Sequence, residues 1–145
     1  MESGRLWSVS VVNQCPCGSG ENFGQCCLPL HLGERLAGTA EELMRSRYSA
    51  YAVGHLDYVW RTWHPRTRPE ALAPSGEVWT GLEILDTVAG RPGDGRGEVE
   101  FRAHYRTSRR SGTGAGLDLR GVLHERSHFA VRARRWFYVD GVLFS

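Results

Sequence analysis

All four cysteines of the chain lie within one short segment, CPCGSGENFGQCC, which runs from Cys15 to Cys27. Cysteines that close together cannot staple distant parts of a fold, which is what disulfides do in secreted proteins. A bond between the adjacent Cys26 and Cys27 would also be badly strained. The Cys-x-x-Cys spacing of redox pairs is absent. We therefore interpret the cluster as a metal site, with a redox or reactive thiol as the alternative.

The chemistry of the cluster favours zinc. Thiolate sulfur is a soft ligand, and four sulfurs complete the tetrahedron of a structural zinc site. Gly18 and Gly20 let the chain turn back and leave backbone N–H groups free to point at sulfur. Thiolates also accept iron, and His31 is near enough in sequence to be an alternative ligand.

Length and composition predict one ordinary domain with a small appendage. The chain has 145 residues, of which 41% are hydrophobic, and that is enough to bury a core. The N-terminal sequence lacks the features of a signal peptide, and no segment approaches the length of a membrane span. We expect a cytoplasmic protein without membrane contact.

The net charge of +2 conceals an uneven distribution. Residues 1–90 carry seven arginines against ten acidic residues, whereas residues 91–135 carry eleven arginines against five. The basic second half is compatible with a polyanion site, although solvated outer strand faces are the plainer interpretation.

Two helices are predicted between the cysteines and any strand. Thr39 and Glu42 have the spacing of a capping box for the helix AEELMRSRYSAYAVG, which Gly54 would end. A shorter helix, LDYVWRTW, begins near Leu56 and ends before Pro65, because proline disfavours helical geometry in the residue before it.

After residue 76 the period changes to that of strands. The four segments EVWTGLEILDTVAG, GEVEFRAHYRTS, GLDLRGVLHERSHFAVRA and RWFYVDGVLF are rich in β-branched and aromatic residues and are separated by turns. Helices first and an antiparallel sheet last predict an α+β fold.

The cysteine segment resembles the SEC-C motif, a small zinc-binding unit found at the C-terminus of the SecA translocase ATPase and on many bacterial proteins. The resemblance implies that Cys15, Cys17, Cys26 and Cys27 are the ligands and that Phe23 is the motif's aromatic residue.

LMRSRYSAYAVGHLDYVWRTWHP and HERSHFAVRARRWFYVDG resemble the YchJ family of bacterial proteins. That resemblance implies a SEC-C motif joined to a domain like nuclear transport factor two, a cone of two to three helices packed on a curved antiparallel sheet of about four strands. It places the zinc knuckle at residues 13–30, a linker at 31–39 and the cone domain at 40–145.

Strand alternation predicts an inward face on the third strand that includes Glu125 and Ser127. A carboxylate on an apolar face needs a partner, and Arg45 or Arg47 on the first helix is the natural one. Further candidates for the wall of a pocket are Tyr48, Tyr51, Trp60, Trp63 and His64.

Two interpretations of this group remain open. Glu125 is a ligand anchor or general base in a small-molecule pocket, or it forms a buried ion pair that fastens helix to sheet. No nucleophile–base pair is recognisable in the sequence, so an enzymatic activity is left undecided.

Three functions follow from these patterns. The first is an interaction module, with a knuckle that recruits a protein partner and a cone that binds a peptide or small molecule. The second is a dehydratase- or isomerase-type enzyme that uses Glu125 and His64. The third is an RNA- or ribosome-associated protein that uses the basic residues Arg102, Arg106, Arg109, Arg110, Arg132, Arg134 and Arg135.

Overall fold

The structure is a computed structural model that describes residues 13–110 and 116–145. The side chains of residues 108–110 and 116–118 lie outside that description. The proposed roles of Arg109 and Arg110 in RNA binding fall on those residues.

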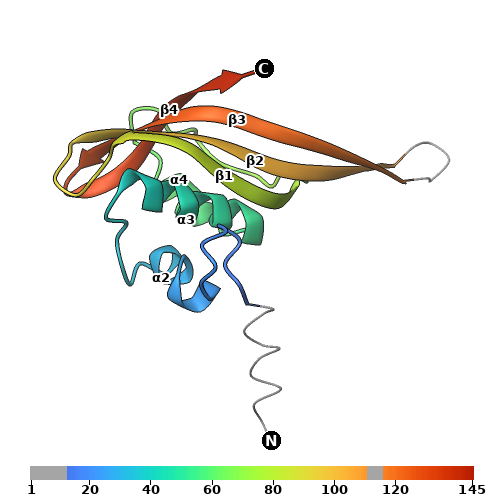
Figure 1. Cartoon of the computed structure of the whole chain (residues 1–145), viewed down its shortest axis with the longest axis horizontal. Helices are drawn as coiled ribbons and strands as arrows, with labels where there is room; N and C mark the ends of the chain where they lie inside the picture. Colours follow the sequence, from blue (N-terminus) through green and yellow to red (C-terminus); the bar gives the residue numbers. More distant parts are fainter. Residues whose placement is uncertain (1–12, 111–115) are drawn as a thin grey trace, which may run out of the picture.

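Four antiparallel strands form one curved sheet in sequence order, as the sequence predicts (Figure 1). They are β1 (Val78–Ala89), β2 (Arg96–Arg110), β3 (Gly116–Arg132) and β4 (Arg135–Phe144). Register shifts interrupt the β1–β2 pairing at two places and the β3–β4 pairing at one. Such bulges bend strands, and the sheet therefore curves over the helices.

The long helix α3 (Ala40–Val53) has the ends that the sequence predicts. The Thr39 side chain accepts the N–H of Glu42, and Gly54 ends the helix with a positive φ of 86°. The Glu42 carboxylate accepts the N–H of Gly38 instead of that of Thr39, so only half of the expected capping box forms. Helix α4 (Leu56–Arg61) follows directly and is shorter than the predicted segment.

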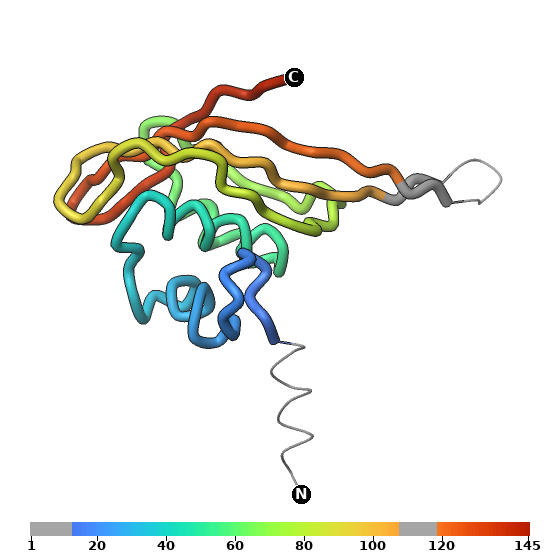
Figure 2. Tube along the Cα trace, viewed as in Figure 1, coloured from blue at the N-terminus to red at the C-terminus, as the bar shows by residue number. Residues whose placement is uncertain are grey.

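The cysteine segment adds two elements that sequence patterns did not reveal. They are a 3₁₀ turn, η1 (Phe23–Gln25), and a single helical turn, α2 (Leu28–His31). Figure 2 shows that this N-terminal segment lies against α3 on the side away from the sheet. Among residues 13–110 and 116–145, no helix is long and apolar enough to cross a membrane.

Helix α3 is therefore buried from two directions. Leu43, Met44 and Tyr48 pack into the main core with Phe101 and Phe129 of the sheet. Ser46 and Ser49 are also fully buried. Those two serines are polar residues in a buried helix, and both hydroxyls bond within the helix to backbone carbonyls. A single apolar stripe would not predict burial this extensive.

The start of α3 is fixed to the β1–β2 hairpin by close backbone contact. Ala40 donates its N–H to the carbonyl of Gly90 at 2.9 Å. A Cβ on Gly97 would lie 2.5 Å from the Cα of Gly90 and 3.1 Å from the Cβ of Ala40. Glycine at 97 is therefore what allows the helix to approach the sheet.

We expect Gly97→Ala to lower the free energy of unfolding by about 1–3 kcal/mol, because the new methyl group meets backbone atoms that cannot move aside. Denaturant titration measures the change. Gly81→Ala is the matched control, since a Cβ there would have nothing within 4 Å. Equal effects of the two substitutions would contradict the proposed close approach.

Candidate functional site

Short-range hydrogen bonds shape the cysteine knuckle. Cys15 N–H donates to Glu21 at 2.9 Å and Phe23 N–H donates to Asn13 at 2.7 Å, so the chain turns back on itself. Gly18 and Gly20, inside that turn, both have φ of 83°, which an L side chain would disfavour. Asn22 accepts the N–H of Gly24 and begins the 3₁₀ turn. The turn brings the two cysteine pairs together.

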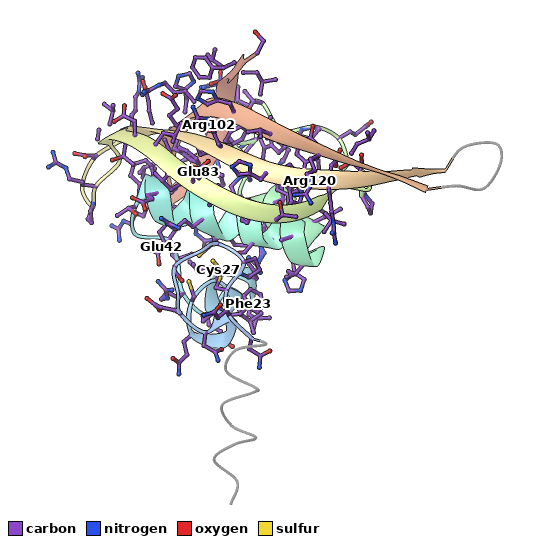
Figure 3. The ribbon with its side chains drawn as sticks, turned by 45° about the vertical axis from the view of Figure 1, so that its right-hand side comes forward. Phe23, Cys27, Glu42, Glu83, Arg102 and Arg120 are labelled. Atoms are coloured by element: carbon purple, nitrogen blue, oxygen red, sulfur yellow. The ribbon has the colours of Figure 1, made fainter. Side chains whose placement is uncertain are left out.

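The four sulfurs form a compact cluster. All four Sγ atoms lie within 4.8 Å of one another, and the Cys26 sulfur lies 3.7 Å from Cys17 and 3.9 Å from Cys27. A tetrahedral ion with metal–sulfur bonds of about 2.3 Å places its sulfurs about 3.8 Å apart. The donor set therefore fits a tetrahedral metal ion. Figure 3 shows the sulfurs at Cys27, beneath α3.

Thiols at such short distances perturb one another. The pKa of Cys17 is lowered because the Cys15 and Cys27 thiols donate hydrogen bonds to its sulfur. The pKa of Cys15 is raised to about 12, first by that hydrogen bond to Cys17. Backbone N–H groups of Cys17 and Ser19 also point at sulfur, as expected from the glycine turn. The cluster thus favours negative charge at the Cys17 sulfur, whereas the pKa values of Cys15 and Cys27 are raised.

Two arginines tie the knuckle to α3. Arg45 donates to the Cys17 carbonyl at 2.8 Å and to Glu41 at 3.0 Å. Arg35 donates to the Cys26 carbonyl at 3.0 Å and forms a salt bridge with Glu42. Both guanidinium groups lie beside the thiols and would offset the negative charge of a four-thiolate site.

His31 anchors the knuckle and is not part of the sulfur cluster. Its Nε2–H donates to the Ser46 carbonyl at 2.8 Å, and its Nδ1 lies 3.0 Å from Nδ1 of His55. Burial lowers the pKa of His31, so the ring is neutral and Nδ1 accepts from His55. Its place as an alternative metal ligand is therefore wrong, because both ring nitrogens face α3 and the start of α4.

A cavity of about 270 Å³ lies between the opposite side of α3 and the sheet. Both charged groups on its wall come from residues that the sequence singled out, Arg47 and Glu125. Most of the remaining wall is aromatic. Its lining residues are Met44, Arg47, Tyr48, Tyr51, Trp63, Trp79, Phe101, Ala103, Leu123, Glu125, Ser127 and Tyr138.

Arg47 is a buried cation with no carboxylate at salt-bridge distance among the residues that the structure describes. It is 5% exposed and donates from Nη1 to the Val59 carbonyl at 2.7 Å and to Thr62 at 2.8 Å. Its guanidinium also lies 5.2 Å from the Trp63 ring centre and 4.6 Å from that of Tyr138. Burial lowers its pKa, against the tyrosines and Glu125, which raise it. Contacts with π faces and oxygens stabilise the charge.

Glu125 points inward, as strand alternation predicts. Its Oε2 accepts hydrogen bonds from Ser127 at 2.8 Å and from Tyr138 at 2.9 Å. Burial and then the Glu125 charge raise the pKa of Tyr138, which keeps this hydroxyl protonated as a donor. Gly141 makes room for the group, because a Cβ there would lie 2.0 Å from Oε2.

The ion pair expected for Glu125 does not form. Among the described residues, no salt bridge within 4.0 Å joins its carboxylate to Arg47, and Arg45 lies on the knuckle side of α3. Arg45 and Arg47 are two positions apart on α3, about 200° around the helix axis, and therefore face opposite layers. The buried-ion-pair interpretation therefore lacks its contact.

The structure gathers most of the predicted pocket residues and excludes three. Arg47, Tyr48, Trp63, Glu125 and Ser127 line the cavity, together with Tyr51. Arg45 lies at the knuckle. His64 lies outside the cavity, where its Nδ1 accepts the N–H of Arg66. Trp60 also lies elsewhere, with its indole N–H on the Pro69 carbonyl.

Tyr138 and Trp79 are wall residues that sequence reasoning missed. Alternation from the buried Trp136 could have placed Tyr138 inward. The β1 bulge between Trp79 and Gly81 breaks the alternation that would have revealed Trp79. Tyr138 is held beside Trp63 because Tyr138 N–H donates to Thr62 and its carbonyl accepts from His64.

On the outer face of the sheet, three histidines that look scattered in the sequence each meet a carboxylate. The pairs are His104–Glu83 at 2.8 Å, His124–Glu100 at 2.7 Å and His128–Asp140 at 2.6 Å. Arg126 forms salt bridges with Asp86, Glu98 and Glu100. Figure 3 shows Glu83 and Arg102 on this face, away from the knuckle. Both signs of charge alternate here.

Comparison with known proteins agrees with this two-part arrangement. A family model described as "YchJ, middle NTF2-like domain" matches residues 39–141, and the SEC-C motif matches residues 13–29. UPF0225 protein SCO1677 of Streptomyces coelicolor is 48% identical over 128 residues, which are 88% of this chain and 93% of that protein. UPF0225 protein GSU1048 of Geobacter sulfurreducens is 44% identical over 138 residues, or 90% and 80% of the two chains.

Solved structures have the same fold. The solution structure of RPA3114, a SEC-C motif containing protein from Rhodopseudomonas palustris, is 32% identical with a TM-score of 0.70, over 91% of this chain and 99% of that one. A SEC-C motif containing protein from Psychrobacter arcticus has a TM-score of 0.68 at 24% identity, over 95% and 86% of the two chains. Together with the matched family model, these relatives place the chain in the YchJ family of UPF0225 proteins, with an N-terminal SEC-C motif and an NTF2-like domain.

Proposed function

We propose that the protein is a zinc-containing module that binds a small organic molecule in the cone cavity. The observation that carries the proposal is that Arg47 and Glu125 both line the same cavity, with no salt bridge between them. Charged groups that a fold buries for stability alone are normally paired. Here each has partial protein contacts, and each faces a space in which a ligand can complete them.

Zinc is the proposed occupant of the knuckle. Four sulfur ligands with the spacing of a tetrahedron are typical of structural zinc sites, which keep no open position for a reacting water. Zinc would contribute folding free energy to residues 13–30, and the thiolates of Cys15, Cys17, Cys26 and Cys27 would hold it. Thiolate ligands agree with a reducing cytoplasm as the compartment.

The knuckle is also the proposed contact for a protein partner. Leu32 and Leu36, in the segment that follows it, are 59% and 54% exposed, which offers apolar area beside the metal site. A bound metal would hold that segment in one conformation for recognition.

Neither alternative function has support of comparable strength. An acid–base enzyme that pairs Glu125 with His64 is disfavoured because His64 lies outside the cavity. RNA binding on the sheet is disfavoured because Glu83, Asp86, Glu98, Glu100 and Asp140 place negative charge on its outer face.

Elemental analysis of the purified protein should find about one zinc per chain. Chelation should disorder residues 13–30 and leave the cone folded, because the cysteines form an apolar cluster separate from the main core. Amide hydrogen exchange distinguishes the two regions.

The double substitution of Cys15 and Cys26 by Ser should abolish zinc binding. Ser19→Ala is the matched control, since its hydroxyl lies 3.2 Å from the Cys26 sulfur without completing the ligand set, and it should retain the metal. Global unfolding on chelation, or zinc retained by the double variant, would count against the assignment.

Glu125→Gln tests whether the cavity is a binding site or a structural element. We expect a loss of about 1 kcal/mol or less in the free energy of unfolding, because the amide oxygen still accepts from Ser127 and Tyr138. A buried ion pair would instead cost about 3–5 kcal/mol when broken. Urea denaturation measures the difference, and Glu83→Gln on the exposed face is the matched control. A loss of about 3–5 kcal/mol would contradict the interpretation of the cavity as a binding site.

A further inference from the structure

One charged group of the cavity has unused hydrogen-bond donors, and the other has an unused acceptor. Nη1 of Arg47 has two acceptors, and the other guanidinium nitrogens have none among the described residues. In the described part of the chain, Trp63 Nε1 is the only side-chain nitrogen or oxygen that is both fully buried and without a hydrogen-bond partner. The unpartnered nitrogens of Arg47 are therefore not fully buried. Arg47 therefore still offers donors to the cavity.

Glu125 offers a hydrogen-bond acceptor to the cavity. Ser127 and Tyr138 both donate to Oε2, whereas no described donor reaches Oε1. The two hydroxyls and the space above Gly141 hold Oε2 in its hydrogen bonds within the protein. Oε1 is left as an acceptor for a ligand. One cavity thus presents donors from α3 and an acceptor from β3.

The rest of the wall selects for a flat, uncharged body. Aromatic rings of Tyr48, Trp79 and Phe101 line the cavity, and Trp79 lies edge-on to Tyr48 with 6.1 Å between ring centres. Rings of this kind stack on other π systems and offer few polar atoms for a charged group.

Resting on the proposed function, we propose that the cavity binds a small neutral heteroaromatic molecule with a lactam edge, in which a carbonyl oxygen accepts from Arg47 and the adjacent N–H donates to Glu125. This edge satisfies both groups at once. A cavity of about 270 Å³ suits a molecule of one or two fused rings.

A zwitterion such as an amino acid is the less favoured occupant. Its two full charges would have to leave water, and the burial cost is recovered only when every lone pair and proton finds a partner. Arg47 already has two oxygens and two ring faces, and Glu125 already has two hydroxyls. A neutral edge needs only one further bond from each.

The test is isothermal titration of the metal-loaded full chain with hypoxanthine and with purine. The two probes share ring shape, but only hypoxanthine has the lactam carbonyl and N–H at that edge. We expect hypoxanthine to bind at least about tenfold more tightly, since a hydrogen bond to a charged group is worth that much. L-Phenylalanine, benzoate and indole serve as zwitterionic, anionic and acceptor-free aromatic probes.

Glu125→Gln should remove the preference for hypoxanthine. The glutamine oxygen stays with Ser127 and Tyr138, so its NH₂ group replaces Oε1 and faces the ligand N–H as a second donor. Purine, which has an acceptor at that ring position, should then bind at least as well as hypoxanthine. Glu83→Gln should change neither affinity.

The outcomes separate this inference from the proposed function. Equal binding of hypoxanthine and purine to the unchanged protein, or tighter binding of L-phenylalanine, benzoate or indole, overturns the lactam inference and leaves a ligand-binding cavity in place. Failure of all five probes to bind overturns the lactam inference, and if no small molecule co-purifies in native mass spectrometry it overturns the proposed function as well.

Discussion

The two-sided burial of α3 is the constraint on which the rest of the structure depends. One side of the helix supplies Met44, Arg47 and Tyr48 to the cavity and core, and the other holds the knuckle through Arg45. The close approach of Ala40 to Gly90 and Gly97 fixes its height above the sheet. The cysteine cluster and the cavity therefore lie on opposite faces of one helix.

Arg47 shows how the fold keeps a buried charge without a salt bridge. Two oxygen acceptors at one nitrogen and two aromatic faces distribute the interaction over the guanidinium. This is a weaker compensation than a carboxylate in contact, and it leaves donors available. These unused donors are the feature on which the proposed ligand binding rests.

Much of the fold could be predicted from local patterns. Thr39 and Gly54 mark the ends of α3 because capping and positive φ depend on residues close in sequence. The four strands follow from their period and turns. The candidate site was predicted less completely. Glu125 and Ser127 were placed inward by alternation, but Tyr138 and Trp79 come from other strands, and their approach depends on bulges and register that a single sequence does not specify.

The sequence by itself determined the four-cysteine cluster, the ends of α3 and the inward direction of Glu125, because each depends on residue type and short spacing. Tertiary structure alone decided the partners. It sent Arg45 to the Cys17 carbonyl and kept Arg47 apart from Glu125. It also turned His64 away from the cavity. The physical reason is that a side chain's direction follows from its own backbone, whereas the atom that it meets depends on how separate layers pack.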